Sequence, residues 1–130
     1  MNAYKLKLMN NNTHVYINVP NANSFHRILA KEMGLVESIF EKSERNHSLQ
    51  QSNIFDKISL IQLITNTLPD IYIKECQSFF IKPFTHDQMM KCLDQNIINN
   101  KVIDGFYKLS KIFPEVGCEL YCFFSKVNNK

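Results

Sequence analysis

The residue in this sequence best placed to act chemically is Lys82. It lies in the run Ser78–Met89, which is typical of a buried strand, a Lys-Pro corner and a helix that follows Thr85. The spacing of Thr85 and Gln88 matches a capping box, in which each side chain accepts a hydrogen bond from the other residue's backbone N–H. This pattern places the lysine at the turn between a strand and a helix. We therefore expect Lys82 to take part in binding.

The other reactive side chains do not suggest a catalytic group. The four histidines are far apart in the sequence, and none has a ligand-like partner three or four residues further on. The three glycines are too widely spaced to form a phosphate-binding loop. General acid–base or nucleophilic catalysis needs several such groups in mutual contact. We therefore expect no catalytic residues, no cofactor and no enzymatic activity.

The cysteines also favour a structural role. There are four, and none forms a Cys-x-x-Cys pair: Cys76, Cys92, Cys118 and Cys122. Cys118 and Cys122 have the even spacing of residues on one face of a strand, so we expect both to pack in one apolar layer. A structural zinc site would need further ligands at a suitable spacing. We therefore expect reduced thiols and no metal.

Length and composition indicate one soluble domain. A chain of 130 residues fits a single domain, here residues 1–130, and 45% hydrophobic residues are enough for one core. The net charge of +3 is mild and the lysines are scattered, so a nucleic-acid partner is not favoured. The sequence shows no apolar run long enough for a membrane span or a signal peptide. We therefore expect a cytoplasmic protein with no membrane contact.

The first third of the chain predicts a hairpin and a helix. Alternating apolar residues over Tyr4–Val19, interrupted by Asn10–Asn12, are typical of a β-hairpin, with His14–Val19 as its second strand. A helix should follow over about Ser24–Met33. Its start should be capped by Asn23, and Gly34 should end it.

The middle of the chain is harder to interpret. Leu35–Phe40 suits a short strand or a further helical turn, and the polar stretch Glu41–Asn53 predicts a loop. Ile54–Leu68 fits both a helix and a buried strand, because its apolar residues are dense. We favour a strand, since isoleucine favours strands and the break at Pro69 follows at once.

The rest of the chain predicts two strands and three helices. A short helix is expected over Pro69–Gln77, and a strand over Phe79–Lys82. Helices should follow over Asp87–Asn99 and Lys101–Phe113, and Cys118–Val127 should form an aromatic-rich final strand. The expected fold is a small α/β domain, a sheet with flanking helices, and an α+β arrangement is the alternative.

The corner Lys82-Pro83-Phe84 with its capped helix resembles the last strand-to-helix step of response-regulator receiver domains. With Ile58–Thr65 as a strand, the second half of the chain would contain two β-α units ending in this corner. The resemblance implies an abbreviated receiver-like fold. It also implies that Lys82 contacts a phosphoryl group and that Thr65 is the hydroxyl residue that senses it.

The acids that a receiver needs are missing from this sequence. In that family, carboxylates after the first strand hold magnesium, which requires near-octahedral oxygen coordination. The matching segment here is Asn18-Val19-Pro20-Asn21, and Asp56 lies only nine residues before Thr65. The resemblance therefore implies a degenerate receiver that is not phosphorylated and acts by binding.

These patterns predict an adaptor or regulator that acts by protein–protein contact. The outer side of the helix after Thr85, together with nearby tyrosines, should contact the partner, and a homodimer is left open. An accessory protein of nucleic acid is the alternative, and an enzyme ranks third. The expected binding residues are Lys82, Thr65, Asp87, Lys91, Asp94, Gln95, Tyr107 and Tyr121.

Overall fold

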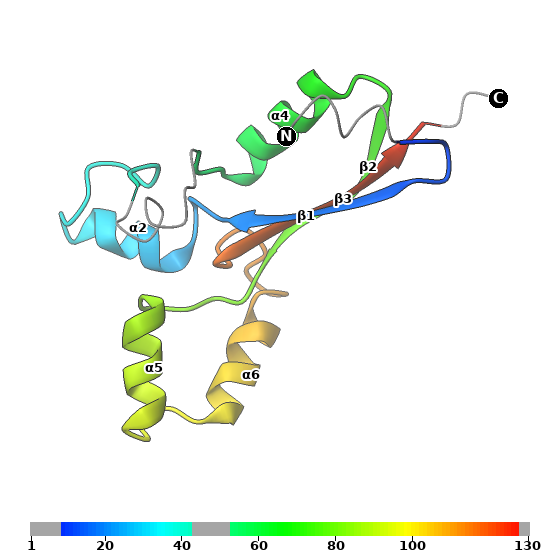
Figure 1. Ribbon diagram of the computed structural model, residues 1–130. Coiled ribbons are helices and arrows are strands. Elements are labelled where there is room, and N and C mark those ends of the chain that lie inside the picture. The colour runs from blue at the N-terminus through cyan, green and yellow to red at the C-terminus, as the bar shows by residue number, and fades with distance from the viewer. Residues whose placement is uncertain (1–8, 43–52, 128–130) are drawn as a thin grey trace.

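A three-stranded antiparallel sheet forms the centre of the protein (Figure 1). The structure is a computed structural model that describes residues 9–42 and 53–127. The strands are β1 (His14–Pro20), β2 (Ile71–Phe79) and β3 (Glu119–Lys126). Their order is β1-β3-β2, so β3 pairs with both neighbours and occupies the centre.

The described helices lie over one face of the sheet and beyond one end of it (Figure 1). They are α2 (Phe25–Glu32), α4 (Lys57–Thr67), α5 (His86–Asp94) and α6 (Asn100–Leu109). Helix α4 lies across one face, whereas α5 and α6 extend away from the end of the sheet on the other side (Figure 1). The mixed α/β character is confirmed. All three strands pair antiparallel, as in the α+β alternative, and the receiver-like arrangement is not confirmed.

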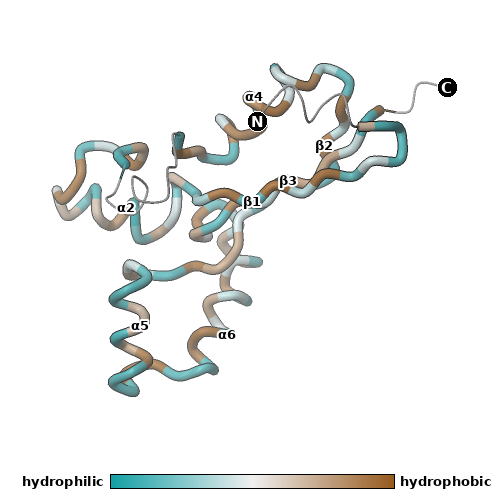
Figure 2. The backbone as a smooth tube through the Cα atoms, viewed as in Figure 1, coloured by the Kyte–Doolittle hydropathy of each residue, from teal (hydrophilic) through white to brown (hydrophobic). Residues whose placement is uncertain are grey.

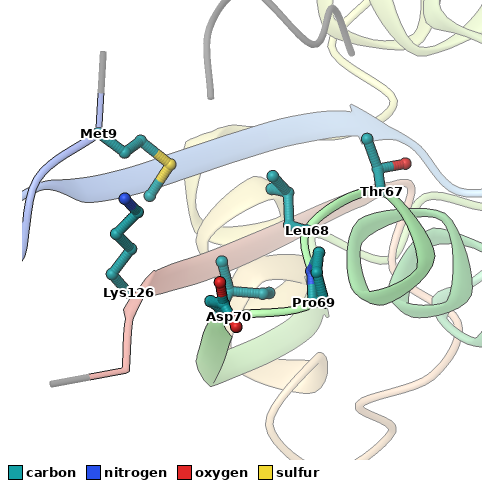
Figure 3. A pocket seen from close by; sticks show the side chains of 7 residues that line it. Met9, Thr67, Leu68, Pro69, Asp70 and Lys126 are labelled. Carbon is teal, nitrogen blue, oxygen red and sulfur yellow. The ribbon is translucent and has the colours of Figure 1, made fainter. Parts of the chain in front are cut away.

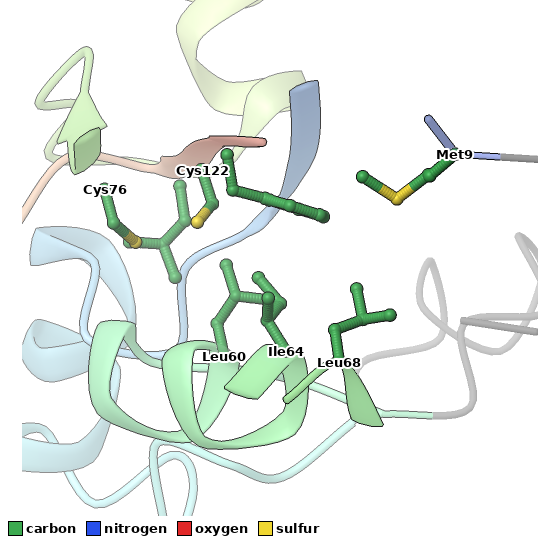
Figure 4. Close-up of a cluster of buried hydrophobic side chains, with 8 residues drawn as sticks. Met9, Leu60, Ile64, Leu68, Cys76 and Cys122 are labelled. Atoms are coloured by element: carbon green, nitrogen blue, oxygen red, sulfur yellow. The ribbon is translucent and has the colours of Figure 1, made fainter. Parts of the chain in front are cut away.

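The core lies between α4 and one face of the sheet. Leu60 and Ile64 are four residues apart, so they share the face of α4 that points to the strands, and the C-cap residue Leu68 is buried beside them (Figure 4). The strands contribute a second set of buried side chains, which pack against the helix: Cys76, Leu120, Cys122 and Phe124. Burying a large aliphatic side chain in this way stabilises the fold by about 1.5–3 kcal/mol.

The strand expected within Ile54–Leu68 is wrong, because α4 occupies this segment. The reason is a capping box at its start. The Ser59 backbone N–H donates to the Asp56 carboxylate at 2.8 Å, and the Ser59 hydroxyl accepts from the Asp56 N–H at 3.0 Å. This cap fixes the first turn, and the helix then buries Leu60 and Ile64.

The helix expected over Pro69–Gln77 and the strand over Phe79–Lys82 are also wrong. Strand β2 occupies Ile71–Phe79, and Lys82 lies in the connection to α5. A bulge between Ile73 and Glu75 shifts the register of β2 on β3. The bulge breaks the two-residue alternation that marks a strand in a sequence.

The first third of the chain matches its prediction in part. The strand His14–Val19 is confirmed as β1, but it pairs with β3, and the expected partner strand in residues 4–8 lies outside the described residues. Helix α2 follows Ser24 rather than Asn23, and Gly34 ends it with a left-handed φ of 76°. Leu35–Phe40 forms turns, and most of the expected loop over Glu41–Asn53 lies outside the described residues.

The capping box at Thr85 is confirmed, since Thr85 and Gln88 bind each other's backbone N–H groups. The helix is shorter than expected. It ends at Asp94, two residues before Asn96 takes a left-handed φ of 56°. Helix α6 likewise ends at Leu109 instead of Phe113, and the final strand is confirmed as β3.

The ends of the three strands meet in what we call the strand-end joint, formed by Asn21, Ser78, Phe79 and residues 114–118. Buried Asn21 donates its side-chain N–H to the carbonyl of Gly117 at 2.7 Å. The Gly117 N–H donates to the Ser78 hydroxyl at 2.9 Å. A β-carbon at Gly117 would lie 2.4 Å from the backbone nitrogen of Phe79. Only glycine permits this approach.

We predict that Gly117→Ala destabilises the protein by about 3 kcal/mol, because two backbone segments must move apart to admit the methyl group. Gly105→Ala is the matched control, since a β-carbon at this position in α6 meets open space. That change should be neutral or stabilising by up to about 1 kcal/mol, as alanine favours helices. Urea denaturation of both variants measures the difference. Equal unfolding midpoints would contradict the role of the joint.

Candidate functional site

The sheet face opposite α4 carries a row of aromatic side chains, which we call the open face. Tyr16 and Tyr72 are each 59% exposed. The Tyr16 and Tyr121 rings stack with centroids 5.8 Å apart, and Phe79 lies 6.0 Å from Tyr121. Such ring pairs add to the stability of the sheet beyond the area they bury. The open face comprises His14, Tyr16, Tyr72, Lys74, Glu75, Phe79, Tyr121 and Phe123.

Lys74 and Glu75 bring opposite charges to the open face. The Lys74 ammonium lies 3.4 Å from His14 Nδ1 and 5.2 Å from the centroid of the Phe123 ring. The Tyr121 hydroxyl donates a hydrogen bond to the Glu75 carboxylate at 2.6 Å. Burial and this hydrogen bond raise the pKa of Tyr121 to about 12. The face is therefore aromatic with a balanced charge.

A second exposed surface lies on residues 80–113, which we call the helical arm. Every residue of α6 is at least partly exposed, and Met89 is the buried residue of α5. Apolar segments recur along both helices away from the sheet (Figure 2). The exposed large hydrophobic residues of the arm are Phe84, Met90, Ile97, Val102, Tyr107, Ile112 and Phe113.

The open face and the helical arm adjoin each other at the end of β2. Phe79 belongs to the open face, and the next residue, Phe80, has a left-handed φ of 59° that turns the chain into the arm. The Phe80 ring lies 4.5 Å from the Tyr107 ring, and the Ile81 N–H donates to the Phe106 carbonyl at 3.2 Å. A second group of aromatic contacts thus begins where the chain leaves the sheet, and it reaches α6.

Lys82 does not end a strand, but it still lies in a structured environment. It is half-buried in the connection from β2 to α5. Burial, together with the positive charges of Lys82 and Arg27, lowers the pKa of His26 to about 4. Burial also raises the pKa of the Cys118 thiol to about 11, although the charge of Lys82 opposes this shift. Lys82 therefore lies close to α2 and to the start of β3.

Lys82 and Thr65, which the receiver resemblance would bring to one site, lie in different parts of the fold. Thr65 is on α4, where its hydroxyl donates to the Ile61 carbonyl at 2.9 Å within the same helix. Helix α4 and the connection that contains Lys82 lie on opposite sides of the sheet (Figure 1). A phosphoryl group at Lys82 would therefore not meet the Thr65 hydroxyl.

The other expected binding residues fall on the two exposed surfaces. Asp87, Lys91 and Asp94 are exposed on α5, and exposed Gln95 is its C-cap. Tyr107 lies on the same helical arm, whereas Tyr121 lies on the open face. Sequence analysis missed the ring partners of Tyr121, which are Tyr16 and Phe79. The position of Tyr16 could have been predicted, because it alternates with Val15 and Ile17 and its side chain must therefore lie on the sheet face away from the core.

A small cavity of about 190 Å³ lies at the other end of the core (Figure 3). Its lining comes mainly from the turn between α4 and β2, with Met9 and Lys126 from outside that turn. The expected binding residues lie elsewhere.

Among residues 9–42 and 53–127, His, Cys, Asp and Glu side chains do not form groups of three that could hold a metal ion. Each helix in the same ranges lacks the length or the apolar character to cross a membrane.

A comparison of the chain with protein-family models and with curated proteins found no match.

We predict that His26 makes the protein less stable as pH falls. The pKa of His26 is about 4 in the folded protein and near 6.5 when unfolded, so the unfolded state binds more protons between these values. The stability present above pH 6.5 is therefore lost as pH falls toward 4, by about 1.4 kcal/mol per pH unit for one proton. Urea denaturation across this range should show the effect in the wild type and its absence in His26→Gln.

Lys82→Gln tests the cause of this pKa shift. Removing the neighbouring positive charge should raise the pKa of His26, and the loss of stability should then span a narrower pH range. Identical pH profiles for the wild type and His26→Gln would show that His26 is not the responsible group.

Proposed function

We propose that this protein is a non-catalytic protein–protein interaction module, an adaptor or regulator, that binds its partner through the open face and the helical arm together. The observation that carries the proposal is the exposure of large apolar side chains on the arm. Ile97 is 68% exposed and Ile112 is 70% exposed, although both are strongly hydrophobic. Large apolar side chains that remain exposed on one segment of a fold are typical of a binding surface.

The composition of the two surfaces suits a protein partner. Interface anchors are commonly aromatic, and both surfaces carry ring pairs, Tyr16 with Tyr121 on the open face and Phe80 with Tyr107 on the arm. The helices of the arm also carry charges of both signs. On α6, Lys108 and Asp104 form an ion pair at 2.9 Å, and α5 exposes Lys91 and Asp94. Mixed charge around an apolar centre is the usual anatomy of a protein interface.

Substitution of exposed apolar residues on the arm tests this proposal. Ile97→Ser combined with Ile112→Ser should weaken partner binding at least about tenfold, equivalent to about 1.4 kcal/mol, because an apolar contact is lost. Both side chains are exposed, so the thermal unfolding midpoint should stay nearly unchanged. The matched control is Ile58→Ser, since Ile58 is also 68% exposed but lies on α4.

The measurement is capture of proteins from the native source on immobilised wild type, arm variant and control, quantified by mass spectrometry. A partner of this surface is retained by the wild type and by Ile58→Ser but lost by the arm variant. Charge reversal by Lys91→Glu with Asp94→Lys should weaken the same partner to a lesser degree. Capture that is equal on all four proteins would refute the proposal. Sedimentation velocity on the wild type identifies the case in which the partner is a second copy.

A nucleic-acid accessory role is the second candidate, and the stacked rings of the open face favour it. Exposed aromatic rings on a sheet can stack on the bases of a single strand, and Lys74 supplies one nearby positive charge. Glu75 beside it offsets that charge, so attraction to phosphates is weak. We rank this role below protein binding for that reason.

Fluorescence anisotropy with a labelled single-stranded oligonucleotide distinguishes the two roles. If the protein is a protein-binding module, we expect little binding at physiological salt and no difference between the wild type and Tyr16→Ala. Tight binding that weakens steeply with salt, and that Tyr16→Ala abolishes, would replace protein binding as the function of the open face.

A further inference from the structure

Cys76 and Cys122 are opposite each other in the pairing of β2 with β3. Both are free thiols on the core face, with exposed fractions of 6% and 0%. Figure 4 shows the two side chains extending from the sheet toward Leu60 of α4. Two neighbouring strands therefore hold a pair of nucleophilic groups side by side, which the proposed function does not use.

The geometry of this pair matches that of a disulfide. Residues directly opposite in an antiparallel pair have Cα atoms about 4.5–5.5 Å apart, and disulfides join residues whose Cα atoms are about 4.4–6.8 Å apart. Both side chains leave the sheet on the same face, so their sulfur atoms can meet without reversing either strand. Cys92 and Cys118 have no such strand pairing with each other, because Cys92 is on α5 and Cys118 precedes β3.

We propose that Cys76 and Cys122 form a reversible cross-strand disulfide when the protein meets a low-molecular-weight disulfide such as oxidised glutathione. The Cys76 thiolate attacks one sulfur of the oxidant, and one molecule of reduced thiol leaves. Cys122 then loses its proton and attacks the sulfur of Cys76, which releases the second thiol. The protein pair is oxidised by two electrons, the oxidant is reduced by two, and both protons leave on the released thiols.

The surroundings of the two thiols favour these roles. The neighbouring Cys122 thiol lowers the pKa of Cys76, although burial opposes this shift, whereas the pKa of Cys122 is raised; Cys76 is therefore the better attacking group. The positive charge of Lys57 also favours the Cys76 thiolate. Cys76 lies on β2, at one side of the described sheet, so local opening of α4 exposes it before Cys122.

The disulfide would close the base of the helical arm. Residues 80–113 lie entirely between Cys76 and Cys122, so the bond would tie together the two strands that lead into and out of the arm. Closing a long loop stabilises a protein by restricting its unfolded state. It would also fix the β2–β3 register beside the bulge, where Glu75 and Tyr121 lie on the open face.

Oxidation of the folded protein tests the proposal in the background Cys92→Ser with Cys118→Ala, in which the pair retains the only thiols. Circular dichroism first verifies that this background is folded. After incubation with oxidised glutathione, intact mass should fall by two hydrogen atoms, and proteolysis should yield a linked peptide that contains Cys76 and Cys122. Cys76→Ser in the same background is the matched control, and its mass should never fall by two hydrogens.

A second measurement uses the same molecule before and after reduction, so it needs no further variant. The oxidised protein should have a higher urea midpoint than the protein treated with dithiothreitol. Two results would overturn the proposal. The first is that the thiols of the folded protein remain free or react no further than a glutathione adduct. The second is that the disulfide forms but lowers the urea midpoint of unfolding. The first would show that the pair cannot react where it lies, and the second that the sheet register does not fit the bond.

Discussion

The fold depends on the close approach of the Gly117 backbone to the backbone of Phe79. This approach is possible because glycine has no β-carbon, and it brings the start of β3 against the end of β2. The side chains of Asn21 and Ser78 then satisfy the polar groups of the same turn, since a buried N–H or carbonyl without a partner costs about 1–3 kcal/mol. One residue without a side chain therefore sets where all three strands end relative to one another.

The same constraint explains why the protein has two unlike sides. With the strand ends held together, the chain between β2 and β3 leaves the sheet as the helical arm and cannot fold back over the core face, which α4 already covers. The side away from α4 is left to aromatic rings and to the exposed hydrophobic residues of the arm. The proposed binding function rests on this second side, where large apolar side chains remain exposed.

Sequence patterns predicted those elements whose signals are local. The cap at Thr85 and the alternation in β1 and β3 depend on neighbouring residues, and both were correct. The patterns failed in Ile58–Ile64, where dense isoleucines obscured the Asp56 cap, and in β2, where the bulge disrupts the alternation. On the proposed binding surface, the exposed positions of α5 could be predicted from helical periodicity. The stacking of Tyr16 on Tyr121 could not, because it requires knowing that the first and last strands pair.

The central position of β3 has a consequence for synthesis of the protein on the ribosome. Both β1 and β2 obtain their hydrogen-bonding partner from residues 119–126, which are made after every other described element. Until those residues leave the exit tunnel, β1 and β2 have unpaired edges and the apolar face of α4 has no complete sheet to cover. Such exposed edges and surfaces promote aggregation of nascent chains. The sheet can therefore close only when β3 becomes available to pair with both of its neighbours.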